Sequence, residues 1–220
     1  MSLKNNNIIT IDGPSASGKG SLAKALAKEL NFILLDSGLL YRAYSYCFDH
    51  SQKHSLAMDL FSQLNIQSID HQMHVFENKK DITSILRHED VAKFASELSS
   101  FKETRDNLIS FQRDLASDHG LVADGRDMGT VVFKEAKLKI FLTASAEVRA
   151  KRRYLELQNR GQEVNMPALI ADIKQRDDKD TSRDLSPLSP ADDAHIIDSS
   201  KMSQEEVLKF VIKIVEEEYF

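Results

Sequence analysis

The residues most suited to chemistry lie together near the start of the chain, where Gly-Pro-Ser-Ala-Ser-Gly-Lys-Gly-Ser occupies positions 13–21. Glycines allow successive backbone N–H groups to curl around a polyphosphate, because no Cβ atom stands in the way. Lys19 supplies a mobile cation for the outer phosphates. A strict Walker A loop has Ser or Thr directly after the lysine, whereas here Gly20 intervenes before the hydroxyl of Ser21. The pattern predicts a nucleoside triphosphate site formed by Gly13, Pro14, Ser15, Ala16, Ser17, Gly18, Lys19, Gly20 and Ser21.

An acidic residue further along the chain suits a metal ion beside that loop. Asp124 follows the apolar run Leu121–Ala123, which is typical of a buried strand. A carboxylate at the end of such a strand can hold Mg²⁺ through a water molecule, next to the hydroxyl of Ser21. The alternative interpretation is a turn-forming Asp-Gly pair, which is common.

Arginines form the second chemical signal. Phosphoryl transfer without a covalent intermediate needs little beyond positioning and charge neutralisation, and a guanidinium grips phosphate through two donors. A single arginine is more often a solvated surface residue, but Arg126, between a glycine and an aspartate, fits that reading least. Arg176 and Arg183 have Asp180 between them, which equally fits an ion-pair cluster at a helix end. The arginines near expected loop edges or helix ends are Arg42, Arg105, Arg126, Arg152, Arg153, Arg160, Arg176 and Arg183.

Two other patterns resemble known sites. Asn78-Lys-Lys-Asp81 matches the guanine motif of GTPases, but no Asp-x-x-Gly precedes it after Ser21, and it falls in a polar hairpin. His71 and His74 are spaced as a metal pair, but a metal site needs further ligands, so surface histidines are favoured.

Composition restricts the class of protein. The chain has 220 residues, of which 29% are charged and 41% hydrophobic, as in an ordinary soluble globular domain. The net charge of −5 gives no basic excess for nucleic acid. Cys47 is the single cysteine, the N-terminus is polar and no apolar run approaches a membrane span. We therefore expect a cytoplasmic protein that binds neither nucleic acid nor membrane.

The elements that must position these residues alternate between strand and helix. The chain opens with a strand at Ile8–Ile11, a helix at Leu22–Leu30, a strand at Phe32–Leu35 and a helix from Leu39. This order is typical of a parallel sheet covered by helices. Further strands are expected at Leu121–Ala123, Leu138–Leu142 and His195–Asp198. Further helices are expected at 103–117, from Ala146, from Pro167 to about Asp178 (with a polar loop from Asp180), and after a capping box at Ser203–Glu206.

The middle of the chain differs from the rest. From about Ser55 to Ser100 it is polar, with brief strands at Ile66–Ile69 and Met73–Glu77, a turn at Asn78–Asp81 and a helix from Ser84. Strands that pair locally do not belong in a doubly wound core, so we expect a small mixed insertion on top of the main sheet. The predicted fold is thus a three-layer α/β domain over 1–220 with a five-stranded parallel sheet. Ligands bind such sheets at the carboxyl ends of the strands, where the loops after the first three strands fall.

Four strings together resemble the bacterial cytidylate kinase family of nucleoside monophosphate kinases: Gly13–Ser21, Asp36-Ser-Gly-Leu-Leu-Tyr-Arg42, Ala123-Asp-Gly-Arg-Asp-Met-Gly-Thr130 and Arg176-Asp-Asp-Lys-Asp-Thr-Ser-Arg183. The resemblance runs from about Ile8 to the final helix, and the family's Gly-Lys-Gly-Ser/Thr form accounts for Gly20. It implies a P-loop kinase fold, with a nucleoside monophosphate-binding subdomain inserted at about 55–100 and a short lid at about 152–167. The implied reaction transfers phosphate from ATP to CMP or dCMP with Mg²⁺, in pyrimidine nucleotide metabolism, and we expect a monomer.

The resemblance also assigns roles by position. Ser37, Arg42, Arg126 and Arg183 would hold the CMP phosphate, and Ser96, Arg105 and Asp127 would bind the cytosine edge. Arg176 and Asp180 would contact the sugar. Arg152 and Arg153 would reach the ATP phosphates. Lys19, Arg126 and Arg183 would stabilise the transferring group, and the acceptor phosphate is itself the nucleophile, so no base is assigned. Two departures are visible: Ser21 replaces the commoner Thr, and Asp184 follows Arg183, where its charge could weaken the grip on phosphate.

Other functions remain open at this level. A small P-loop kinase for UMP, AMP or a non-nucleotide acceptor would share the core and differ in the residues that read the base. A regulatory switch that binds ATP or GTP without an acceptor is a different class, and the acceptor-type arginines argue against it.

Overall fold

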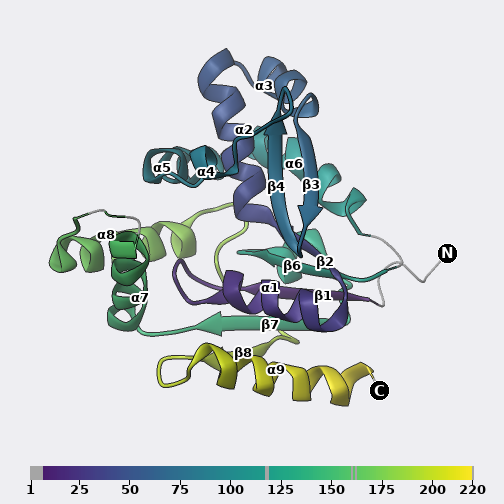
Figure 1. Cartoon of the computed structure of the whole chain (residues 1–220), viewed down its shortest axis with the longest axis vertical. Coiled ribbons are helices and arrows are strands. Elements are labelled where there is room, and N and C mark those ends of the chain that lie inside the picture. Colours follow the sequence, from purple (N-terminus) through teal and green to yellow (C-terminus); the bar gives the residue numbers. More distant parts are fainter. Residues whose placement is uncertain (1–6, 117–118, 160, 162, 220) are drawn as a thin grey trace.

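The larger sheet of the molecule carries the predicted parallel strands. The computed structural model describes residues 7–116, 119–159, 161 and 163–219 (Figure 1). Five parallel strands lie in the order β2-β6-β1-β7-β8. They are β1 (Ile8–Asp12), β2 (Ile33–Asp36), β6 (Leu121–Gly125), β7 (Leu138–Thr143) and β8 (His195–Asp198). The predicted five-stranded parallel sheet is confirmed, and β1, which leads into the phosphate loop, lies at its centre.

Helices cover both faces of this sheet. Alternate residues of a strand point to opposite faces, so Ile9 and Ile11 join the core beneath α1 (Lys19–Leu30) and α9 (Gln204–Tyr219), whereas Ile8 joins the core on the other face. That second core contains residues of α2 (Ser37–Ser51), α3 (His54–Ser62) and α6 (Lys102–Asp114). The predicted three layers are therefore present.

The segment between α2 and α6 has its own small sheet. Strands β3 (Asn65–Ile69), β4 (Gln72–Glu77) and β5 (Lys80–Asp81) pair antiparallel and stand above the main sheet in Figure 1. The prediction of one helix from Ser84 is wrong: α4 (Thr83–Leu86) and α5 (Glu89–Leu98) are separated where His88 takes an extended conformation. Helix α3 was not predicted, because only Ala57 and Phe61 of its nine residues are buried.

The second half of the chain adds one element that the pattern did not indicate. A π-helix, η1 (Met128–Val132), follows β6, and the Asp12 carboxylate accepts hydrogen bonds of 2.8 Å from the amides of Met128 and Gly129. Helix α7 (Ala146–Asn159) starts behind Ser145, whose Oγ accepts from the Val148 amide. The capping box at Ser203 and Glu206 is confirmed.

Helix α8 (Met166–Ser182) is longer than predicted. The expected polar loop from Asp180 is wrong, because Asp180 is a buried residue of the last helical turn, paired with Arg126. Helices α5, α7 and α8 gather beyond the carboxyl ends of the strands, at the left of Figure 1. Arg160 and Ser117, which the sequence analysis assigned to a loop and a helix end, lie outside the described residues.

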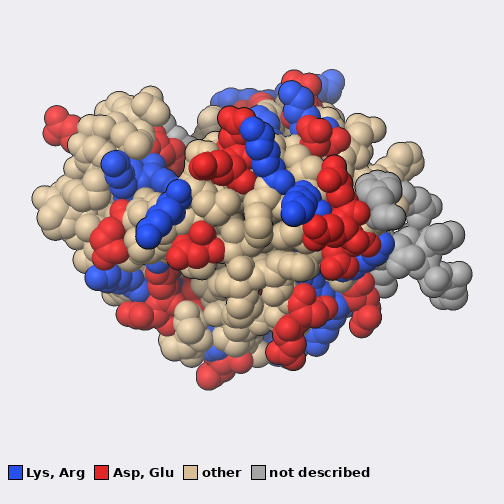
Figure 2. Space-filling model, turned by 90° about the horizontal axis from the view of Figure 1, so that it is seen from below, with Lys and Arg blue, Asp and Glu red and all other residues tan. Residues whose placement is uncertain are grey.

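The surface carries charges of both signs. Lys and Arg side chains are interspersed with Asp and Glu over the face shown in Figure 2. Among the described residues, no helix combines the length and the apolar character that crossing a bilayer requires.

Candidate active site

The phosphate loop connects β1 to α1 in a conformation that needs its glycines. Gly13 has a φ of +151° and Gly18 a φ of +96°. A Cβ on Gly13 would lie 2.1 Å from the carbonyl oxygen of Leu142, so no larger residue fits there. Ala16 takes a left-handed φ of 60°, which is uncommon for a residue with a Cβ. Lys19 Nζ donates to the carbonyl of Pro14 at 3.3 Å, within the loop.

A cleft at the carboxyl edge of the sheet brings together most of the residues that the sequence singled out. Its lining includes Ser15, Ala16, Lys19, Gly20, Ser37, Arg42, Ser96, Arg105, Asp124, Arg126, Asp127, Arg153, Arg176, Asp180 and Arg183. The other loop residues, Gly13, Pro14, Ser17 and Gly18, shape the loop without lining the cleft. Ser21 is exposed in the first turn of α1 and does not line it either.

The cleft is electropositive although the chain is acidic. Eight Lys and Arg side chains line it against five Asp and Glu, whereas the whole chain has a net charge of −5. Burial, with Arg126 nearby, lowers the pKa of Lys19 to about 8, and burial lowers the pKa of Arg176 to about 10. Burial also lowers the pKa values of Arg42 and Arg183. Cations crowded in this way attract a multiply charged anion.

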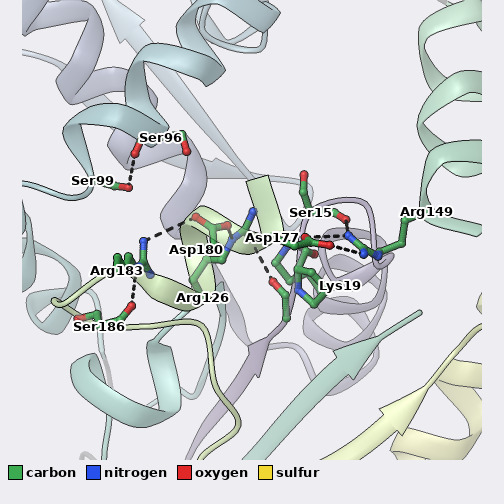
Figure 3. A network of polar contacts seen from close by, with 12 residues as sticks. Ser15, Lys19, Ser96, Ser99, Arg126, Arg149, Asp177, Asp180, Arg183 and Ser186 are labelled. Atoms are coloured by element: carbon green, nitrogen blue, oxygen red, sulfur yellow. Dashed lines mark hydrogen bonds and ion pairs between the residues drawn. The ribbon is translucent and has the colours of Figure 1, made fainter. Parts of the chain in front are cut away.

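In one cluster of the cleft, arginine N–H donors are left without a hydrogen-bond partner among the described residues (Figure 3). Arg126 Nε donates to Asp180 Oδ2 at 2.7 Å, and Arg183 Nη1 lies 3.9 Å from Asp180 Oδ1. Arg183 therefore forms an ion pair with Asp180 at the end of α8. Yet Arg183 Nη2 and Arg176 Nε are buried without a hydrogen-bond partner among the described residues. Asp184 is exposed, and the carboxylate that faces Arg183 belongs to Asp180.

A second cluster closes the other end of the cleft. Arg105 forms an ion pair with the buried Asp127 and donates to the Ser99 carbonyl at 3.2 Å. Its guanidinium lies 5.9 Å from the ring centroid of Tyr41. Ser96 lines the same region. The carboxylate offers an acceptor and the guanidinium offers donors side by side, as recognition of a base edge requires.

Asp124 satisfies the chemistry of a Mg²⁺ ligand. Its Oδ1 is buried without a hydrogen-bond partner among the described residues, and burial raises the pKa of the carboxyl to about 6. A Cβ on Gly20 would lie 3.2 Å from Asp124 Oδ2, so this acid directly adjoins the first turn of α1. An unpaired buried carboxylate beside a phosphate loop fits a hard cation.

Several residues of the site were not predicted. Asp36 accepts a hydrogen bond from the Leu39 amide at 2.9 Å and forms an ion pair with Arg87 at 3.3 Å. Its position directly before the predicted site residue Ser37 was the sequence signal that could have indicated it. Ser37 Oγ donates to Gln112 Oε1 at 2.7 Å. Gln112 comes from α6, 75 residues away, and no sequence spacing indicates it.

The two lid arginines differ in position. Arg153 lines the cleft and forms an ion pair with Glu89 of α5. Arg152 does not line the cleft: it donates to the Ser17 carbonyl at 2.7 Å and to the Ser199 carbonyl at 2.8 Å. The predicted contact of Arg152 with ATP phosphates therefore has to compete with these backbone partners.

Comparisons with known proteins show the family and the fold of the chain. A family model described as cytidylate kinase matches residues 9–217. The chain is 42% identical to a cytidylate kinase of Pasteurella multocida, over 98% of this chain and 97% of that protein. It is 45% identical to one of Pseudomonas fluorescens, over 93% of each. A crystal structure of an uncharacterized protein from Eubacterium ventriosum shares the fold, with a TM-score of 0.54, 16% identity and coverage of 96% and 99%. The chain therefore belongs to the cytidylate kinase family.

Proposed function

We propose that the chain transfers the terminal phosphate of ATP to CMP or dCMP, giving ADP and CDP or dCDP, with Mg²⁺. As a member of the cytidylate kinase family the chain is a phosphotransferase. The observation that carries the proposal is the buried pair of unpartnered donors, Arg176 Nε and Arg183 Nη2, in an electropositive cleft beside the phosphate loop. Buried donors without an acceptor are costly unless a ligand supplies one.

The proposed transfer needs no protein base. A nucleoside monophosphate is already an anionic nucleophile at neutral pH, so the protein has to align it with the donor and neutralise the transferring charge. Lys19 would act on the donor side, and Arg126 and Arg183 would act between donor and acceptor. Arg42 and Ser37 would complete the grip on the acceptor phosphate, and Arg176 and Asp180 would contact its sugar.

The second cluster supports a cytosine acceptor. Cytosine presents an amino donor beside ring acceptors, whereas uracil presents a carbonyl in place of that amino group. The carboxylate of Asp127 would accept from the amino group, and Arg105 would donate to the ring acceptors, with Ser96 beside them. A uracil carbonyl would face the same carboxylate and be repelled.

Ser21 and Asp124 would hold the metal ion, Asp124 through a water molecule. Bound there, Mg²⁺ would neutralise charge on the phosphates of ATP. The unpartnered Oδ1 of Asp124 supports this assignment.

Two segments would close over the substrates. We propose that the insertion at about 55–100 closes over the acceptor and that the lid at about 152–167 closes over the donor, which excludes water and suppresses ATP hydrolysis. Ser96 and Arg153 come from these two segments and line one cleft. We further propose that the protein acts as a cytoplasmic monomer and binds no nucleic acid; its net charge of −5 supports the last point.

The test measures ADP release with CMP, dCMP, UMP, AMP or no acceptor. We expect turnover with CMP and dCMP and little with the other acceptors. Asp127→Asn should narrow the difference between CMP and UMP, because an amide can donate to the uracil carbonyl. Equal turnover of UMP or AMP by the unmodified protein would refute the cytidine assignment. ADP release that does not depend on any acceptor would instead indicate a nucleotide hydrolase or switch.

A further inference from the structure

Three arginines donate to backbone carbonyls at alternate residues of the phosphate loop. Arg126 donates to the carbonyl of Gly13 at 3.2 Å, Arg149 to that of Ser15 at 3.2 Å and Arg152 to that of Ser17 at 2.7 Å. We call these three residues the arginine collar. Figure 3 shows Arg126 and Arg149 on opposite sides of Ser15 and Lys19.

Arg149 is the member of the collar with no role in the cleft. Its side chain is 6% exposed and it does not line the cleft. Its Nε donates to the Ala144 carbonyl at 2.9 Å, and its Nη1 donates both to Ser15 and, at 3.0 Å, to Asp177 Oδ1. Its Nη2 donates to Asp177 Oδ2, which makes the pair with this acid of α8 bidentate. A buried arginine with all these partners is fixed in position.

The topology explains how the collar closes around the loop. Strand β1 lies between β6 and β7, so the loop after β1 is flanked by Arg126 after β6 and by Arg149 at the start of α7. Each of these arginines also pairs with an acid of α8, Arg126 with Asp180 and Arg149 with Asp177. The two acids are three residues apart and so share a face of the helix.

Holding a carbonyl outward turns an amide inward. In a trans peptide the C=O and the following N–H point in opposite directions, and the described chain has no cis peptide bond. The Ser15 carbonyl shares its peptide with the amide of Ala16, and the Ser17 carbonyl shares its peptide with the amide of Gly18. Arg149 and Arg152 therefore fix two amides on the inner side of the loop, where a phosphate accepts hydrogen bonds.

We propose that Arg149, anchored by Asp177, is a positioning residue for the phosphate donor: it holds the loop in its binding conformation without touching the nucleotide. The proposal rests on the proposed function, in that the donor is ATP. Because a preorganised loop loses less conformational entropy on binding, loss of the anchor weakens donor binding selectively. The side chains proposed to hold the acceptor are not among the hydrogen-bond partners of Arg149, so the acceptor keeps its affinity.

The experiment measures the binding of ATP and of CMP separately by calorimetry. Asp177→Asn removes the charge of the anchor, and Arg149→Lys keeps a charge that cannot reach all the partners of the guanidinium. In both variants we expect the Kd of ATP to rise about tenfold and that of CMP to change less than about twofold. Asp177→Glu, which keeps the carboxylate, should restore part of the affinity for ATP.

The matched control joins the same two helices at the surface. Lys174 of α8 lies 4.0 Å from Glu147 of α7, and both side chains are more than half exposed. Lys174→Met should leave both Kd values unchanged. Amide hydrogen exchange of the ligand-free variants adds a direct measurement, because the Ala16 and Gly18 amides should exchange faster while the sheet amides do not.

The outcomes separate this inference from the proposed function. If the unmodified protein does not bind ATP, the proposed function fails. If it binds ATP but the Asp177 and Arg149 variants weaken ATP and CMP equally, or lower only the melting temperature, the positioning role is wrong. If only one of the Asp177→Asn and Arg149→Lys variants folds, its Kd values for ATP and CMP decide. If both fold but are too unstable for calorimetry, the exchange rates of the Ala16 and Gly18 amides decide.

Discussion

Lys19 is surrounded by groups that oppose its charge in the ligand-free protein. Burial is the main reason that its pKa falls from 10.5 to about 8, and Arg126 and Arg176 add to the effect, whereas Asp124 acts against it. A polyphosphate beside the ammonium would favour the charged form again. Binding of ATP and protonation of Lys19 are therefore linked.

This linkage predicts a loss of ATP affinity at alkaline pH. Below pH about 8 the ligand-free Lys19 is already protonated, so binding takes up no proton at this residue. As the pH rises above about 8, binding has to recruit a proton and the affinity falls. Calorimetry at about pH 8.5 in two buffers of different ionisation enthalpy should show proton uptake. Lys19→Gln should abolish the uptake, and equal heats in both buffers for the unmodified protein would contradict the prediction.

Residue types and spacing predicted some of the charged residues that meet in the cleft, but not Asp36 and Arg87, which also line it. Lys19, Asp124 and Arg126 were recognisable because each stands directly after a predicted strand or its loop, at the edge where ligands bind. Asp12 and Arg149 were not recognisable, because their partners are 116 and 134 residues away. Their function depends on pairing across the sheet, which leaves no local pattern.

At the scale of elements, the phosphate loop contains one residue that is under backbone strain. Ala16 has a φ of 60°, a region that L-residues other than Asn and Asp avoid and that glycine adopts freely. Its neighbours Gly13 and Gly18 take positive φ without that cost.

We predict that Ala16→Gly stabilises the protein by about 0.5–1 kcal/mol, the relief of strain being partly offset by the greater entropy of glycine in the unfolded chain. The measurement is chemical unfolding of the two proteins under the same conditions. Gly13→Ala is the opposite control: its Cβ would lie 2.1 Å from the Leu142 carbonyl, so it should destabilise strongly. A destabilising Ala16→Gly would mean that the methyl group contributes packing that exceeds the strain.

The small antiparallel sheet has an acid whose environment favours its charge. Hydrogen bonds from the Thr83 side chain and amide, and from His74, lower the pKa of Asp81 to about 2. Asp81 follows β4 across the turn at Asn78 and Lys79 and pairs with Phe76.

This shift predicts part of the acid sensitivity of the protein. Because the folded-state pKa lies below the ordinary value of 3.8, the stabilisation is complete above pH about 4 and is lost as the pH falls toward about 2. Asp81→Asn should therefore flatten the fall in the free energy of unfolding over that range. Asp70→Asn, in the exposed turn between β3 and β4, is the control. If the free energy of unfolding of Asp81→Asn fell with pH as steeply as that of the unmodified protein, Asp81 would not be a source of the acid sensitivity.

Helix bounds and breaks were the least predictable part of the fold. The end of α8 was placed too early because Asp180 looked like the start of a polar loop, whereas it is buried in the last turn, where it pairs with Arg126 of the loop after β6. The apolar spacing after Ser84 suggested one helix, but the Arg87 side chain turns toward Asp36 where α4 and α5 separate. At both places a residue near the misplaced bound has an ion-pair partner far away in the sequence, which no local pattern indicates.

At the scale of the whole molecule, the two segments that flank the cleft are joined in the ligand-free structure. Glu89 of α5 forms an ion pair with Arg153 of α7. This charge pair joins elements from different parts of the chain, and it occupies an arginine proposed for ATP.

We predict that Glu89→Gln lets the ligand-free protein open more widely. Spin labels on cysteines introduced at the exposed positions Lys93 and Lys151 would report the separation of α5 and α7, and the native Cys47 is buried and so does not compete for the label. We expect a longer and broader distance distribution in the variant, which narrows again when ATP and CMP are added. Identical distributions in the two ligand-free proteins would show that the pair does not hold the segments together.

The central place of β1 has a consequence for how the chain folds during synthesis. The strand precedes both of its partners in the chain, and these begin at Leu121 and Leu138. During synthesis the phosphate loop therefore lacks the two strands that flank it until β6 and β7 have been made. Until then the apolar run Ile8–Ile11 lacks its sheet partners, and an exposed apolar segment of this kind is prone to aggregate and is a target for chaperones. A sheet whose first strand lay at its edge would need only one later partner for that strand.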